Sequence, residues 1–92
     1  MKFLTDLRQI PGIGPSIEQD LLAIGVKSQA DLRGKNPEQL YEADAAVKGH
    51  YSDRCVLYVF RLAVYYAEND VHEAEKLKWW YWQDKNLNKS TE

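Results

Sequence analysis

The stretch Ile10-Pro11-Gly12-Ile13-Gly14-Pro15-Ser16 decides how this 92-residue chain folds. Two glycines one residue apart separate two segments whose apolar residues recur at helical spacing. Glycine adopts positive φ and has no Cβ, so the turn can be tight and its backbone amides can approach a ligand. Pro15 suits the first position of the following helix, where the N–H that it lacks would be unpaired anyway. We therefore expect a tight turn that leads into a helix N-terminus, with Ile13 turned inward between the two segments.

Helix start and stop signals on both sides of this turn predict an all-α fold. A short helix is expected over Leu4 to Ile10, and a second from Pro15 to a stop at Gly25. A single capped turn is expected from Ser28 to Gly34. Two longer helices are expected after it, one capped by Asn36 and ending at about Gly49, the other capped by Ser52 and ending at about Glu68. A last helix is expected from Glu73 to Gln83.

The fold we expect is one compact domain of five or six short helices over residues 1–84, followed by a polar tail at 85–92. The helix that ends near Glu68 is apolar on most of its circumference. A helix of that kind is buried on all sides, so we place it at the centre of the domain.

Composition and charge narrow the classes of function. Twelve Lys plus Arg against 14 Asp plus Glu leave a net charge of −2, which is unusual for a dedicated nucleic-acid-binding domain. One cysteine excludes an internal disulfide framework. No secretory signal is visible, and the apolar run Cys55–Ala67 is shorter than the ~20 residues that a membrane helix needs. We expect a cytoplasmic chain with no membrane partner.

The glycine turn also predicts a binding site for an anion. The first amides of the second helix have no partner within that helix, and they lie at the positive end of its dipole. Together with the exposed amides of the turn, they would suit one phosphate group. The alternative is that the turn serves only as a tight connection between two helices.

The segment resembles a helix-hairpin-helix motif of the SAM-like type. Leu7, the run 10–14, Leu21 and Leu22, and Gly25-Val26 carry the resemblance; the motif lies at about 4–25, and the likeness extends from Leu4 to Leu40. It implies DNA binding without sequence specificity, through the amides of Gly12, Ile13, Gly14 and Ser16. In some members a monovalent cation binds hairpin carbonyls, which would here be those of Arg8, Ile10 and Ile13. No other cofactor is expected.

The remainder resembles a narrower bacterial group of helix-hairpin-helix proteins that is labelled only by its occurrence at a pathogenicity locus. The runs 53–61, 65–68 and 78–82 carry this likeness, which extends it to residues 4–84. The label describes a genomic neighbourhood, so it implies a fold and assigns no activity.

The charges near the glycine turn depart from the DNA-binding pattern. Members that bind DNA well usually place Lys or Arg just after the glycines, whereas this chain has Glu18 and Asp20 there. The cations that could fold back beside the turn are Lys27, Arg33 and Lys35, with Lys2 and Arg8 on its other side. The leading hypothesis is therefore weak, salt-sensitive binding to DNA.

A second hypothesis is a protein-interaction adaptor built on the aromatic run 79–82. Exposed, its residues Trp79, Trp80 and Trp82 could anchor a partner protein or stack on unpaired bases. The alternative is that they close an open side of a small core. On a helix, residues 79 and 82 share one face while 80 and 81 diverge from it.

No catalytic constellation is visible, and we expect the chain not to be an enzyme. Cys55 is interpreted as a small buried hydrophobe, since nothing orients His50 as its base. Neither histidine has the spacing of a metal ligand. Arg61, inside the most apolar helix, is expected to reach solvent or to pair with a carboxylate.

Overall fold

The computed structural model describes residues 5–83, so Leu4 and the tail predicted at 85–92 lie outside the described residues. The predicted all-α fold is confirmed, because this part of the chain contains helices and no strand. Four elements are α-helices: α1 (Pro15–Ala23), α2 (Gln29–Leu32), α3 (Pro37–Lys48) and α4 (Arg54–Glu68). Three more are 3-10 helices: η1 (Asp6–Gln9), η2 (Ala74–Leu77) and η3 (Trp79–Trp82).

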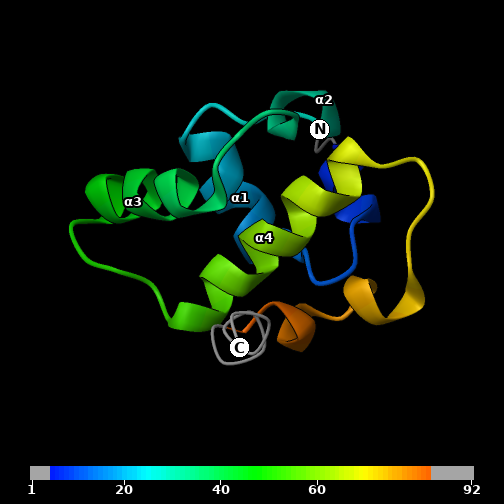
Figure 1. Ribbon diagram of the computed structural model, residues 1–92. Helices are drawn as coiled ribbons and strands as arrows, with labels where there is room; N and C mark the ends of the chain where they lie inside the picture. The colour runs from blue at the N-terminus through cyan, green and yellow to red at the C-terminus, as the bar shows by residue number, and fades with distance from the viewer. Residues whose placement is uncertain (1–4, 84–92) are drawn as a thin grey trace.

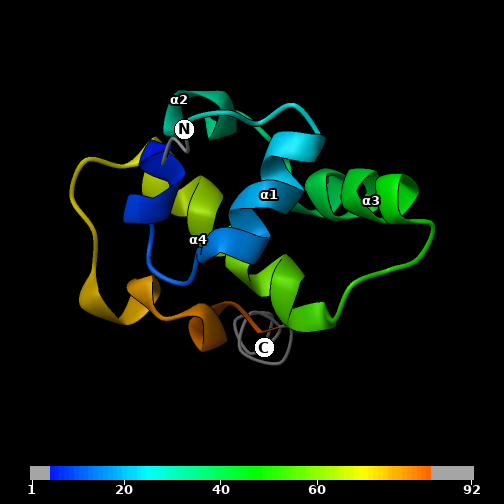
Figure 2. The same ribbon diagram turned by 180° about the vertical axis from the view of Figure 1, so that it is seen from behind.

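Helix α4 crosses the middle of the molecule (Figure 1), and α2, α3, η2 and η3 pack against it, while α1 packs against α3 and η1. Seen from behind, α1 crosses in front of α4, while α3 extends to one side (Figure 2). Six consecutive residues of α4, from position 59 to position 64, are buried. The prediction of a central helix is therefore confirmed, and its apolar circumference explains why.

Several predicted helix boundaries are also confirmed. The side chain of Asn36 accepts hydrogen bonds from the amides of Glu38 and Gln39, which begins α3 as expected of a helix-capping asparagine. At the other end Gly49 adopts φ 82°, the left-handed conformation that favours glycine after a helix.

The start of the central helix differs from the prediction. Its first residue is Arg54 and its capping residue is Asp53, not Ser52. The hydroxyl of Ser52 instead donates to the carboxylate of Asp44 on α3, at 2.9 Å. Because the Ser52 hydroxyl is bonded to the buried carboxylate of Asp44, it does not cap the first amides of α4.

The first predicted helix is only a 3-10 turn, because Pro11 leaves it no room. The residue before a proline is driven out of the helical region, and Ile10 is extended, with φ −78° and ψ 125°. Thr5 is the capping residue, so four residues remain between the two limits, and they form η1.

The helix predicted from Glu73 to Gln83 is also replaced by two 3-10 turns. Lys78 between them is extended, with φ −100° and ψ 128°, and interrupts the helix. The indole Nε1 of Trp82 donates to the carbonyl of Lys76 at 2.9 Å, which closes the two turns on each other. Among the described residues, no helix has the length and apolar character needed to cross a membrane.

Candidate nucleic-acid interface

The glycine turn between η1 and α1 has the geometry that its sequence predicts. The amide of Ile13 donates to the carbonyl of Ile10 at 3.1 Å, and Gly12 between them adopts φ 90°. Proline followed by a residue with positive φ is typical of a type II turn. Ile13 is buried, as expected, and its amide is consumed by the turn itself. It is therefore not one of the amides available to a ligand.

The other predicted amides lie at or beside the start of α1. Gly14 caps the helix without a side chain, in an extended conformation (φ −102°, ψ −170°), and Pro15 and Ser16 after it are exposed. The amide of Glu18 closes the first helical hydrogen bond, to Gly14. Within residues 5–83, the amides of Gly12, Gly14, Ser16 and Ile17 have no acceptor.

The carboxylate of Glu18 points back toward η1 rather than toward solvent. The residue is only 3 % exposed, and its Oε2 accepts from the Thr5 amide at 3.0 Å and the Thr5 hydroxyl at 2.7 Å. Its Oε1 pairs with the Arg8 guanidinium at 3.3 Å. The two bonds from Thr5 lower the pKa of Glu18, and Arg8 adds to them against the opposing effect of burial. This carboxylate is thus matched internally, and so is the cation of Arg8.

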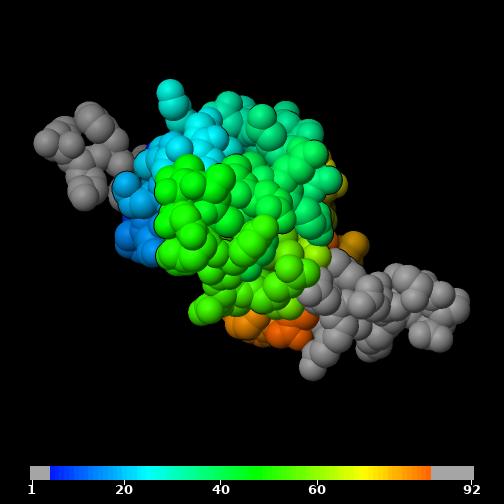
Figure 3. All heavy atoms as spheres, turned by 90° about the vertical axis from the view of Figure 1, so that its left-hand side faces the viewer, coloured from blue at the N-terminus to red at the C-terminus, as the bar shows by residue number. Residues whose placement is uncertain are grey.

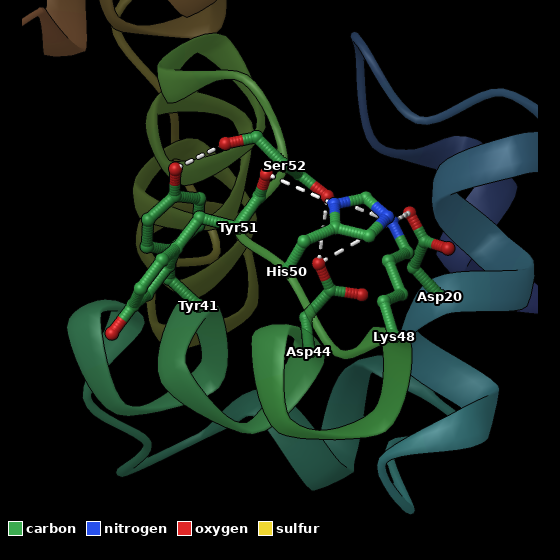
Figure 4. A network of polar contacts seen from close by, with 7 residues as sticks. All are labelled: Asp20, Tyr41, Asp44, Lys48, His50, Tyr51 and Ser52. Atoms are coloured by element: carbon green, nitrogen blue, oxygen red, sulfur yellow. Dashed lines mark hydrogen bonds and ion pairs between the residues drawn. The ribbon is translucent and has the colours of Figure 1, made fainter.

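The second carboxylate of α1, Asp20, belongs to a network that joins α1, α3 and the segment between α3 and α4 (Figure 4). Lys48 lies 3.1 Å from Asp20, 3.3 Å from Asp44 and 2.8 Å from the Ser52 hydroxyl. Asp44 is 1 % exposed, so this network carries a buried charge. The Tyr41 hydroxyl donates to the Ser52 carbonyl beside it.

This network has a structural role, because Lys48 cannot act as a base toward the Ser52 hydroxyl as the lysine of a catalytic serine–lysine pair does. Burial alone would lower the pKa of Lys48, but the hydrogen bonds and charges of Asp20 and Asp44 outweigh it and raise that pKa above its ordinary value. A lysine that stays protonated cannot accept a proton from Ser52. Sequence reasoning missed the network, because its members come from positions 20 to 52 and share no local pattern.

The cations predicted to flank the glycine turn, Lys27, Arg33 and Lys35, follow α1 and α2 in the chain. Lys27 follows the opposite end of α1, a nine-residue helix about 13 Å long. Arg33 donates from Nε to the carbonyl of Ala67, at the end of α4, and Lys35 is exposed after α2. In Figure 3 the blue atoms of α1 lie at the left and the teal atoms around α2 at the upper right. The first residue of α2, Gln29, nevertheless bonds to Asp6 and Gln9, so α2 lies against η1. Within residues 5–83, no hydrogen bond or ion pair joins Lys27, Arg33 or Lys35 to the predicted amides.

The aromatic run divides between core and surface. Trp79 stacks on Tyr58 with ring centroids 6.4 Å apart, and Trp82 contacts Tyr65 at 5.5 Å. Trp80 is 50 % exposed. The shared face of positions 79 and 82 follows from the three-residue period of a 3-10 helix. Two of the three predicted interface tryptophans thus cover α4.

Two single residues complete the comparison with the sequence. Arg61 pairs with Glu38 at 2.8 Å, which confirms the expected carboxylate partner. The interpretation of Cys55 is wrong, because the residue is exposed. It lies in the first turn of α4, and burial in that helix begins at Leu57 and becomes continuous only from Val59.

Comparison with known proteins identifies a family. No match to the chain was found among the curated proteins or among the solved structures. A family model described as "Pathogenicity locus" matches residues 1–88, which is nearly the whole chain. The protein therefore belongs to the Pathogenicity locus family.

Proposed function

We propose that this protein is an accessory module that binds the DNA backbone without reading sequence, through a helix-hairpin-helix motif at about residues 4–25. The observation that carries the proposal is the set of unpaired amides at the start of α1, on Gly14, Ser16 and Ile17. They lie beside an exposed proline and serine, where a phosphate oxygen has access. Donors of this kind at the positive end of a helix dipole favour a phosphate.

The internal pairing of the α1 carboxylates supports the same proposal. Glu18 is engaged by Thr5 and Arg8, and Asp20 by Lys48, so neither presents an uncompensated charge to the ligand. The departure from the DNA-binding charge pattern is thereby reduced, although no additional cation is supplied. Salt dependence would come from phosphates that Lys or Arg side chains neutralise along the bound backbone. One to three such contacts would give the logarithm of the binding constant a slope of about −1 to −3 against that of the salt concentration.

The monovalent cation remains part of the proposal as a ligand of the turn. Three uncharged carbonyls, on Arg8, Ile10 and Ile13, are the donor type that suits a potassium ion. The Ile10 oxygen already accepts the Ile13 amide and keeps one lone pair for a cation. Such an ion would add one positive charge beside the amides. Replacing potassium with tetramethylammonium, which is too large for carbonyl coordination, should then weaken DNA binding.

The direct test is fluorescence anisotropy of labelled single- and double-stranded DNA, titrated with the protein at low and physiological KCl. Gly14→Val is the informative variant, because a Cβ at Gly14 meets nothing within 4 Å and the backbone there is extended. The variant should fold and yet block the approach of a phosphate, with a loss of affinity of about tenfold, the value of one charge-assisted hydrogen bond.

Ala23→Val is the matched control, since it adds similar bulk to an exposed position at the other end of α1. It should leave DNA binding unchanged. No binding of the wild-type protein at low salt would contradict the proposed function. An equal loss of affinity in both variants would show that the glycine turn is not the DNA-binding site.

A second candidate is the protein-interaction adaptor, favoured by the half-exposed indole of Trp80. Trp79 and Trp82 contribute less surface, since both pack against α4. The two candidates differ in chemistry. Binding through amides weakens as salt rises, whereas an aromatic interface tolerates salt and is lost in Trp80→Ala.

A further inference from the structure

A groove of about 370 Å³ lies between the start of α3, the second half of α4 and η3, away from the glycine turn. Its apolar lining comes from Pro37, Val64, Tyr65 and Trp82. Two of these are aromatic rings in contact, with centroids 5.5 Å apart and planes tilted by 43°. The volume is at the lower end of what small-ligand sites enclose, and it suits one long side chain.

The polar groups of the groove are unequally matched. Arg61 is the cation that lines it, and its guanidinium is committed to the carboxylate of Glu38 at 2.8 Å and to the Trp82 carbonyl at 2.7 Å. The positive charge of Arg61 is therefore balanced by Glu38 within the protein. A further anion placed in the groove would have to compete with Glu38 for this donor.

The acceptors of the groove, by contrast, keep spare capacity. Glu68 uses Oε2 to accept the Gly34 amide at 2.8 Å, and Asn69 uses Nδ2 to donate to the Tyr65 carbonyl at 2.8 Å. In the described part of the chain, Oε1 of Glu68 and Oδ1 of Asn69 have no donor. Both side chains stand at the C-terminal end of α4, which is the negative end of its dipole.

We propose that this groove binds the side chain of a lysine from a partner protein. A lysine has an apolar stem of four carbons that matches the lining by Pro37 and Val64. Its ammonium group supplies the donors that Glu68 and Asn69 lack, and it is attracted to the face of Trp82. The Tyr65 ring already has a cation, since the Lys76 ammonium lies 5.6 Å from its centroid. The groove contains no residue of the hairpin, so lysine binding can be tested independently of DNA binding.

The test is a ¹H–¹⁵N NMR titration of the full chain at constant ionic strength. The probes are Nα-acetyl-lysine methylamide and its Nε-acetylated derivative, which keeps the stem and removes the charge. The lysine probe should shift the Trp82 indole signal and the amides of Tyr65 and Asn69 saturably, with a Kd of about 1 mM for a ligand of this size. The acetylated probe should shift them little.

Glu68→Gln should weaken binding of the lysine probe by about threefold to fivefold, as expected for one partly exposed ion pair. The amide oxygen can still accept from Gly34, so the fold is retained. Glu75→Gln is the matched control, because it changes the net charge equally at an exposed position outside the groove. Equal binding of the two probes would identify a site for apolar segments and overturn the proposal. Equal weakening by the two variants would reduce the effect to general charge and would also overturn it.

Discussion

The hairpin at the N-terminal end and the aromatic arm at the C-terminal end both pack on α4, but they are held there by different means. The hairpin, residues 5–23, depends on backbone geometry: a turn closed by Ile13 and Ile10, a positive φ at Gly12 and a proline that begins α1. The arm, residues 74–83, consists of two short turns that depend on side-chain contacts with α4.

This difference explains why the local sequence predicts the structure of the hairpin better than that of the arm. Glycine permits positive φ and proline fixes φ wherever they occur, so the backbone of the hairpin is determined by its own residues. The arm has neither residue, and its tryptophans favour burial without specifying a backbone conformation. Its shape therefore depends on the surface of α4, which the local sequence of the arm does not contain.

The largest loss of stability is expected at Gly12, because a substitution there tests directly whether backbone conformation holds the hairpin. Gly12→Val should lower the free energy of unfolding by about 1–3 kcal/mol, the cost of a branched residue held at positive φ. The Cβ alone would lie 3.7 Å from Leu62 and Val59, so the branched methyl groups add crowding.

Urea unfolding followed by circular dichroism measures this change. The comparison variant is Gly14→Val, for which we expect a loss of no more than about 1 kcal/mol from the weaker capping residue. Equal losses for the two variants would show that positive φ at Gly12 is not what holds the turn.

A second prediction concerns acid. The pKa of Glu18 is lowered in the fold, mainly by the hydrogen bonds from Thr5, so its ionised form stabilises the hairpin. That stabilisation is complete above the ordinary value of 4.5 and is lost as the pH falls through the lower value of the folded protein. Urea unfolding at several pH values between 7 and 3 should show this loss. In Glu18→Gln the same decline should be shallower, and an unchanged slope would contradict the assigned role.

The smallest effect is expected in the arm. Trp82→Phe removes the indole N–H that donates to Lys76, one partly buried hydrogen bond worth about 1 kcal/mol. Amide hydrogen exchange should become faster in η2 and η3 while protection in α1 and α3 stays the same. Faster exchange throughout the protein would mean that the arm and the hairpin are not separate in stability.

Much of the fold follows from local signals. The boundaries of α1, α2 and α3 follow from their proline, capping and glycine residues, and α4 follows from a run of apolar residues too continuous for a surface helix. The candidate site was only partly predictable. The amides at the start of α1 follow from Gly14 and Pro15, whereas the use of the Ile13 amide inside the turn required the structure.

What the sequence by itself determined, then, is the presence of α1 to α4 and the glycine turn, because capping, proline and glycine act through bonds within a few residues. The tertiary structure alone decided the orientation of Glu18 and Asp20, the placement of Arg33 against the end of α4, and the division of the tryptophans between core and surface. Each of these depends on partners 10 or more residues away along the chain. Charge pairing and burial are properties of neighbours in space, and helix packing chooses those neighbours.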